Sequence, residues 1–485
     1  MQDELIAKDQ KQNSHDVKHH DQHAEIDGPF LFFAHGLIVR YGKLYRLGIM
    51  DTSQDQESIN WQTYLNAGKK ALGLSRYQDA EKLFQKALMD ARREQSQSNL
   101  AQQAASAESD LLISLGLADI SSNMGELYRL QGLFKEAESF FKQAIDLYEK
   151  SIGENTRPMA EALTRLGAVF RGQGKYSSVE PLLRRALSIY ENADSQIEDQ
   201  LEVATMLETL ADFLRAHGKY QAAEPLFQRA LAKRESVLGP EHPSIAGNLH
   251  NLAVLYHAEG KYDLAEPLYE RAVRLYEESW GLEHPSVATV LNNQAELYRM
   301  LGDFPRAEKI HWRALRIRQG MLGINHPSTA QTLSNLALLF HIQCKYDQAE
   351  PLYKTLLDQR TADWGPKHMH VAEILNSLAD VYHEQGKFSE AEPLYWRAVE
   401  IIQENMGHEH PTVARALQRL ATLYEEQENF DEADRLYRWG LGVSEKALGA
   451  EHPEVAELVA RYAALQRKLI LDNEDGDTTE NLWRD

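Results

Sequence analysis

Two columns of polar residues recur along this chain, at a spacing of 42 residues over most of its length. The first column is rich in asparagine and contains Asn66, Asn123, Arg165, Thr209, Asn251, Asn293, Asn335, Ser377 and Arg419. An asparagine amide both donates and accepts hydrogen bonds, so a ladder of amides can satisfy the backbone of an extended peptide. Asparagine is also a poor helix former, and its return inside a helical pattern indicates a bonding role. The alternative is that each amide bonds the neighbouring repeat.

The second column is basic and contains Arg129, Arg171, Arg215, His257, Arg299, His341 and His383, followed by Glu425. In a chain with a net charge of −21, this column predicts a locally positive surface that suits an acidic ligand. The alternative is that the arginines pair with glutamates on neighbouring helices. Glu126, Glu296 and Asp380 stand close enough in the sequence pattern to be such partners.

The elements that must position these columns follow from the same period. The alanine of a recurring "AE" pair steps by 42 residues from Ala265 through Ala307 to Ala433, so that nine units cover residues 58–449. Each unit has two stretches with apolar residues at helical spacing, as in 245–258 and 262–278. Neither helix can bury its apolar stripe alone, so the period predicts a solenoid in which stacked units share one core.

Glycine and proline mark the ends of the expected helices. Gly260 should end a first helix. The proline of the recurring "AEPL" is expected in the first turn of the second helix, with Asp263 as the N-cap, Glu266 three residues later and Pro267 in the first turn. One histidine per unit lies between repeats. These residues are expected to close loops rather than to bind a metal, because histidines in neighbouring units would stand about 10 Å apart, whereas zinc ligands lie about 2 Å from the ion.

Stretches such as "HPSVATVLNNQAELYRMLGDFPRAEKIHWRALRI" resemble the tetratricopeptide repeat. The 42-residue form, with "AEPLY" and "HP" at fixed places, is similar to that of kinesin light chains. The resemblance implies an all-α fold, a right-handed α-solenoid of antiparallel helix pairs. It also implies that the first helix of each pair lines a concave groove that holds an extended peptide or a partner helix. Residues 1–57 lack the sustained heptads of a kinesin subunit, so a prokaryotic relative is expected instead.

The resemblance and the two columns together give a candidate peptide-binding groove. Two further residues, Arg415 and Arg419, match the basic pair of tetratricopeptide domains that clamp a C-terminal carboxylate. The preceding repeats offer Ser377, Ser334 and Leu338 where that clamp has Asn, Lys and Asn, so a complete clamp is not expected. The candidate groove residues are Asn123, Asn251, Asn293, Asn335, Arg129, Arg171, Arg215, His257, Arg299, His341, His383, Arg415 and Arg419.

Four regions are expected along the chain. Residues 1–57 form a polar, His-rich N-terminal tail with a short apolar segment; residues 58–449 hold the nine repeats, with an insertion near 93–110; residues 450–471 form a capping helix; and residues 472–485 form an acidic, disordered tail. This tail contains Trp483. Because the resemblance implies grooves that accept tryptophan-acidic peptides, the tail could occupy the chain's own groove. The alternative is a free solubilising tail.

Composition narrows the functional class. The negative charge argues against general nucleic-acid binding, and the longest apolar stretch has too few residues to span a membrane. The single cysteine, Cys344, excludes an intramolecular disulfide and is typical of a cytoplasmic protein. The sequence shows no enzyme, cofactor or metal motif. We therefore expect a non-enzymatic adaptor that binds an extended, acidic segment of another protein, with a ligand-sensing solenoid or a self-assembling scaffold as alternatives.

Overall fold

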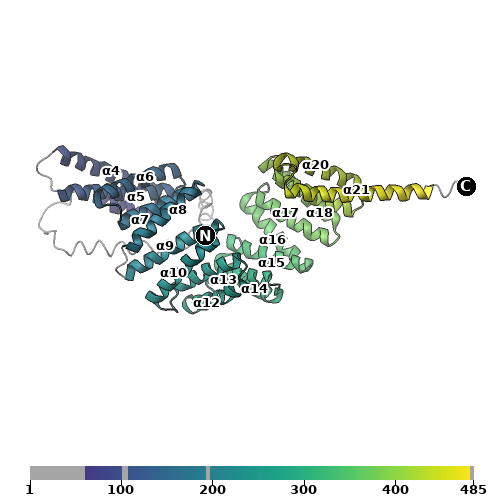
Figure 1. Cartoon of the computed structure of the whole chain (residues 1–485), viewed down its shortest axis with the longest axis horizontal. Helices are drawn as coiled ribbons and strands as arrows, with labels where there is room; N and C mark the ends of the chain where they lie inside the picture. The colour runs from purple at the N-terminus through teal and green to yellow at the C-terminus, as the bar shows by residue number, and fades with distance from the viewer. Residues whose placement is uncertain (1–59, 101–106, 193–196, 481–485) are drawn as a thin grey trace, which may run out of the picture. The chain divides into compact units, whose positions relative to one another are not determined.

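The computed structural model describes residues 60–100, 107–192 and 197–480. In these ranges the chain forms nineteen α-helices, α3–α21, one short 3-10 helix and no strand (Figure 1). The chain divides into two units, Met1–Asn192 and Ala193–Asp485. Residues 1–59 and 481–485, which include the expected N-terminal tail and Trp483, lie outside the described residues.

The first unit contains three helix pairs. Each pair packs tightly, and the second helices of the first two pairs also pack on the first helix of the next pair. The expected insertion near 93–110 falls on the end of one helix and the start of the next, with residues 101–106 outside the described ranges. The helices are α3 (Trp61–Gly73), α4 (Tyr77–Leu100), α5 (Ala107–Leu130), α6 (Phe134–Ile152), α7 (Arg157–Gly172), η3 (Tyr176–Ser178) and α8 (Val179–Asn192).

The second unit continues the same pattern with six pairs and a final helix, which confirms the predicted all-α solenoid of helix pairs. The last helix extends to Glu480, beyond the expected domain boundary at residue 471, and these boundaries stay predictions. The helices are α9 (Ile197–Ala216), α10 (Tyr220–Leu238), α11 (Ser244–Ala258), α12 (Tyr262–Trp280), α13 (Pro285–Met300), α14 (Phe304–Leu322), α15 (Pro327–Ile342), α16 (Tyr346–Trp364), α17 (Met369–Glu384), α18 (Phe388–Met406), α19 (Pro411–Glu426), α20 (Phe430–Leu448) and α21 (Pro453–Glu480).

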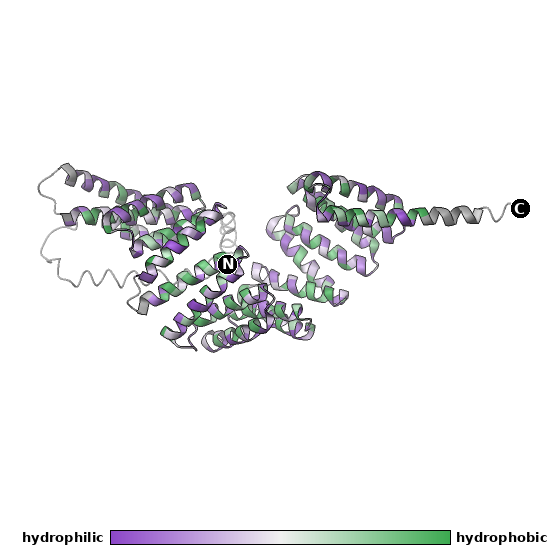
Figure 2. Cartoon of the chain, in the orientation of Figure 1, coloured by the Kyte–Doolittle hydropathy of each residue, from purple (hydrophilic) through white to green (hydrophobic). Residues whose placement is uncertain are grey.

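Small residues set the distance between the helices of a pair. Ala253 on α11 and Ala265 on α12 are both completely buried, and the equivalent alanines of the following repeats are buried in the same way. Large side chains such as Tyr269 fill the space beside them. Figure 2 shows apolar and polar residues alternating along each helix, as expected where one side of a helix packs into a shared core.

The turn inside each repeat is tighter than the sequence analysis expected. Gly260 has φ +73°, and the N–H of Lys261 donates to the carbonyl of Tyr256 at 2.8 Å, so the first helix closes and the second begins at once. The N-cap of α12 is Lys261, and Pro267 lies inside the helix. The assignments of Asp263 as the N-cap and of Pro267 to the first turn were therefore both wrong, since Pro267 is the sixth residue of α12.

Two of the second helices have a side-chain cap because their N-cap position holds an acceptor. In α14 and α20 this position is Asp303 and Asn429, whose side chains accept hydrogen bonds from the N–H groups of Arg306 and Glu432. Lysine offers no acceptor, so α12 begins without a side-chain cap. The recurrent proline is then tolerated because the interruption falls close to the start of the helix, where only one hydrogen bond of the ladder is lost.

Candidate peptide-binding face on the first helices

The candidate groove residues all lie on the first helices of the pairs. In the second unit these are α9, α11, α13, α15, α17 and α19, and in the first unit α3, α5 and α7. Successive first helices contact one another from α3 to α7 in the first unit and from α9 to α15 in the second, so their exposed sides form a continuous surface there. We call this surface, taken separately in each unit, the first-helix face.

Several residues of the asparagine column bond the preceding repeat. The Asn293 amide lies 2.8 Å from Nε2 of His250, and the Asn335 amide donates to the amide oxygen of Asn292 at 3.3 Å. In the first unit, Arg165 donates to Ser122 at 3.3 Å. Each pair is 43 residues apart, which is one period plus one residue. At these positions the column joins neighbouring first helices, the alternative that the sequence left open.

Asn251 differs from the other column members. The residue 43 positions earlier is Glu208, but this carboxylate is held by Arg234 at 2.7 Å and also accepts a hydrogen bond from Asn248. Asn251 is half-buried and has no hydrogen-bond partner among the residues that the structure describes. Its amide is therefore available to a ligand. Asn123 instead donates to the carbonyl of Asp119 in its own helix at 2.7 Å.

The arginines of the basic column are largely paired within their own helices. Arg129 makes two 2.9 Å hydrogen bonds with Glu126, and Arg299 makes one of 2.9 Å with Glu296. Arg215 lies 3.2 Å from Asp212. Residues three apart on a helix are neighbours on its surface, which explains why the partners stand on the same helix and not on the next one. A ligand carboxylate must displace these acids to reach the guanidinium groups.

Other candidate basic residues have no carboxylate partner on their own helix. Arg171 in the first unit and Arg415 in the second are exposed, and neither has an ion-pair partner among the described residues. His257 and His341 instead meet aromatic rings edge-on, with ring centroids 5.7 Å from Tyr262 and 6.0 Å from Tyr346. Burial lowers the pKa of His257 below its ordinary value, so this imidazole is neutral near pH 7 and adds no charge to the column.

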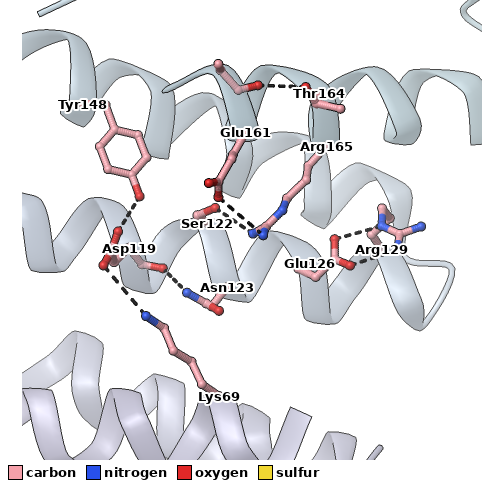
Figure 3. Close-up of polar contacts among 11 residues, drawn as sticks. Lys69, Asp119, Ser122, Asn123, Glu126, Arg129, Tyr148, Glu161, Thr164 and Arg165 are labelled. Atoms are coloured by element: carbon pink, nitrogen blue, oxygen red, sulfur yellow. Dashed lines mark hydrogen bonds and ion pairs between the residues drawn. The ribbon is translucent and has the colours of Figure 1, made fainter. Parts of the chain in front are cut away.

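The first unit presents a dense polar cluster on the same face (Figure 3). The hydroxyl of Tyr148 donates to Asp119 at 2.5 Å, and Lys69 lies 3.9 Å from the same carboxylate. Glu161 lies 3.8 Å from Arg165, and burial raises the pKa of Glu161. Positive and negative groups alternate here and mostly satisfy one another, so this part of the face is polar without a dominant charge.

A third column of polar residues lies one residue before the asparagine column, and the sequence did not lead us to predict it. It contains the acceptors His250 and Asn292, and also Asn376, whose amide oxygen is buried without a partner among the described residues. The residue that would reach Asn376 is Arg419, but this arginine bonds Asp380 instead. The same 42-residue period, examined one position earlier, would have shown this column.

The histidines between repeats cap helices. In each of six loops, Nδ1 accepts a hydrogen bond from the backbone N–H two residues later, at 3.2–3.3 Å. This arrangement satisfies one free donor of the following helix and closes the loop, as predicted. In the described part of the chain, no group of three or more His, Cys, Asp or Glu residues could hold a metal ion. The capping residues are His242, His284, His326, His368, His410 and His452.

Comparison with known proteins agrees with this architecture. Two tetratricopeptide repeat family models match the chain, one at residues 116–192, 202–278, 283–362 and 370–446, the other at 326–405. The chain belongs to the tetratricopeptide repeat family. Among curated proteins, no sequence matches this chain.

Solved structures with the same kind of repeats are similar to this tetratricopeptide chain. The apo form of RapI is 15% identical, covers 80% of this chain and 98% of its own, and has a TM-score of 0.53; at this identity it shows the fold alone. BtubC (BKLC) from P. vanneervenii is 27% identical over 47% of this chain and 88% of its own, with a TM-score of 0.40. A putative kinesin light chain of Podosopora anserina is 23% identical over 43% and 98%, with a TM-score of 0.39.

The carboxylate clamp of some tetratricopeptide domains is incomplete in this one. Arg419 is engaged by Asp380 of the preceding repeat, and the hydroxyl of Ser377 donates to the carbonyl of Glu373 in its own helix at 3.1 Å. Of the basic pair, only Arg415 is free of such contacts among the described residues. None of the described tetratricopeptide helices combines the length and the apolar character that crossing a membrane requires.

Proposed function

We propose that the chain is a non-enzymatic adaptor that binds an extended, acidic segment of a partner protein on the first-helix face. The observation that carries this proposal is the half-buried amide of Asn251, which has no partner among the described residues, whereas Asn293 and Asn335 are both engaged. A free amide inside a helix gives the fold nothing. It can, however, bond both the N–H and the C=O groups of a peptide.

Support for an acidic ligand comes from the exposed arginines that have no carboxylate partner in the described ranges. These are Arg171 in the first unit and Arg415 in the second. Arg299 and its equivalents contribute less, because a ligand must compete with acids that are already in place. Binding should therefore weaken with salt, but only moderately, since few ion pairs form anew.

A peptide-display selection on the full chain tests the proposal, with affinities of individual peptides measured by fluorescence anisotropy. Asn251→Ala should weaken the selected peptides about fivefold, because one hydrogen bond contributes about 1 kcal/mol. Asn335→Ala is the matched control: it removes an amide from the same column, but that amide joins two repeats, so stability should fall while peptide affinity is kept. Wild-type affinity of Asn251→Ala for every selected peptide would exclude this assignment.

A further inference from the structure

A cleft lies away from the first-helix face. It is lined by the second helices α12 and α14 and by α13, which stands between them in the chain. Its volume is about 820 Å³, within the usual range of ligand sites. Val273 of α12, Leu291 of α13 and Ile310 of α14 supply apolar surface. The remaining lining is mostly polar and charged.

One residue of this cleft, Gln294, is polar at a position where a residue that serves only the fold would be apolar. Gln294 lines it, is only 6% exposed, and has no hydrogen-bond partner among the described residues. The amide atoms of Gln294 themselves keep contact with solvent in the cleft, so they are open to a ligand. Other repeats place an apolar residue at the equivalent position. These residues are Ala67, Met124, Leu166, Leu210, Leu252, Leu336, Leu378 and Leu420.

The charge of the cleft is opposite to that of the whole chain. Five cationic and two carboxylate side chains line it, although the chain carries −21 overall. Lys309 and Arg316 are exposed and have no ion-pair partner in the described ranges. Arg313, by contrast, pairs with Glu277. Two cations of this patch are thus available to a ligand at no cost in existing ion pairs.

An exposed tryptophan stands between these two cations. Trp312 is 45% exposed, and Lys309, Trp312 and Arg316 follow one another at intervals of three and four residues, so they share one side of α14. The two cations are seven positions apart, which corresponds to about 10 Å along a helix. Carboxylates three residues apart in a peptide of polyproline II conformation lie on the same side at a similar spacing, about 9 Å. A small anion would instead need cations that converge on one point.

We infer that the α12–α14 cleft is a second docking surface, which binds an acidic peptide segment that carries an apolar side chain. Acidic side chains of the segment pair with Lys309 and Arg316, the apolar side chain packs on Trp312, and a backbone group of the peptide bonds the amide of Gln294. The surface is separate from the first-helix face and goes beyond the adaptor function proposed above. This ligand explains why Gln294 is polar although the equivalent residues of other repeats are apolar.

The experiment uses a random peptide library displayed on phage and selected on the full chain. Selected peptides are then measured by fluorescence anisotropy against three variants: Lys309→Glu with Arg316→Glu, Gln294→Leu, and Asn251→Ala. We expect a class of acidic peptides with an apolar residue that lose at least tenfold in affinity with the charge reversal, about fivefold with Gln294→Leu, and nothing with Asn251→Ala. Gln294→Leu should also raise the thermal midpoint, because leucine is the residue of six other repeats, so its loss of binding cannot be assigned to unfolding.

Two results would overturn the inference. One is a selection in which no peptide responds to either cleft variant. The other is a set of responding peptides without acidic residues. The two proposals fail separately: peptides that respond only to Asn251→Ala support the first-helix face and exclude the cleft, and peptides that respond only to the cleft variants do the reverse.

Discussion

Replacing His250 by asparagine should remove part of the acid sensitivity of the second unit. His250 lies on α11, is half-buried and contacts side chains from two other helices. Asn293 of α13 bonds its Nε2, and the ring of Tyr269 of α12 lies 6.0 Å away. Burial, with a smaller effect of the charge on Arg215, lowers the pKa of His250 to about 4.

The sign of the effect follows from proton binding. With a pKa of about 4 in the folded chain and about 6.5 in the unfolded chain, His250 takes up a proton on unfolding whenever the pH lies between these values. The folded state therefore loses stability as the pH falls below about 6.5. The loss is about 2 kcal/mol at pH 5 and approaches about 3.4 kcal/mol below pH 4, at 1.36 kcal/mol for each unit of pKa difference.

Asparagine is the matched replacement because the next repeat already uses it. Asn292 is the residue equivalent to His250, and it accepts a hydrogen bond from Asn335 in the same way. His250→Asn therefore keeps the contact between repeats and removes only the titrating group. A 180° rotation of the Asn293 amide could restore a hydrogen bond to a protonated ring, but it would not remove the cost of burying the charge.

Amide hydrogen exchange, resolved for α11 and α13, measures the effect where it arises, because a repeat array opens locally. Between pH 7.5 and pH 5, the opening free energy of the wild type should fall by about 2 kcal/mol more than that of His250→Asn. His408→Asn, at an exposed loop position, controls for the loss of one imidazole. Equal losses in the wild type and in His250→Asn would refute the burial argument.

Three further outcomes are expected from variants of single contacts. Asn335→Ala should lower stability by about 1–2 kcal/mol in urea unfolding, because Asn292 loses its bonding partner while buried; an unchanged midpoint would mean that this contact does not join the repeats. Arg234→Met should cost about 1–3 kcal/mol, because Glu208, whose pKa burial already raises to about 7, becomes neutral and loses its contact with Arg234; adding Glu208→Leu should recover most of this loss, and failure to recover would point to packing instead. Cys344→Gly should raise the free energy of unfolding by about 0.5–1 kcal/mol, because Cys344 has φ +56° at a turn position where most repeats have glycine. The thermal midpoint should rise accordingly, and no rise would show that the turn carries little strain.

Local rules explain why so much of the fold could be predicted. Helix periodicity, the glycine at each turn and the 42-residue spacing act over a few residues or repeat many times, and they determined the helix pairs and their shared core. The same reasoning misplaced the start of α12, since the type of cap depends on how closely Lys261 follows the turn at Gly260.

The candidate site could be predicted only in part. The sequence placed the asparagine and basic columns on the first helices, but it could not say which amides are free. That depends on partners 43 residues away: Asn293 reaches His250, whereas the carboxylate that Asn251 would meet is already taken by Arg234. A contact between repeats is decided by the rotation and rise of one unit on the next, which no local pattern encodes.

The sequence by itself therefore determined that this is an array of tetratricopeptide helix pairs, and which helix surfaces carry recurring polar residues. Only the tertiary structure decided how those residues are used. Arg299 donates a hydrogen bond to Glu296 on its own helix, and Gln294 lines a cleft together with the cations Lys309 and Arg316. The physical reason is that hydrogen bonds and ion pairs go to whichever partner packing brings within about 3 Å, so residues of the same type at equivalent positions end in different roles.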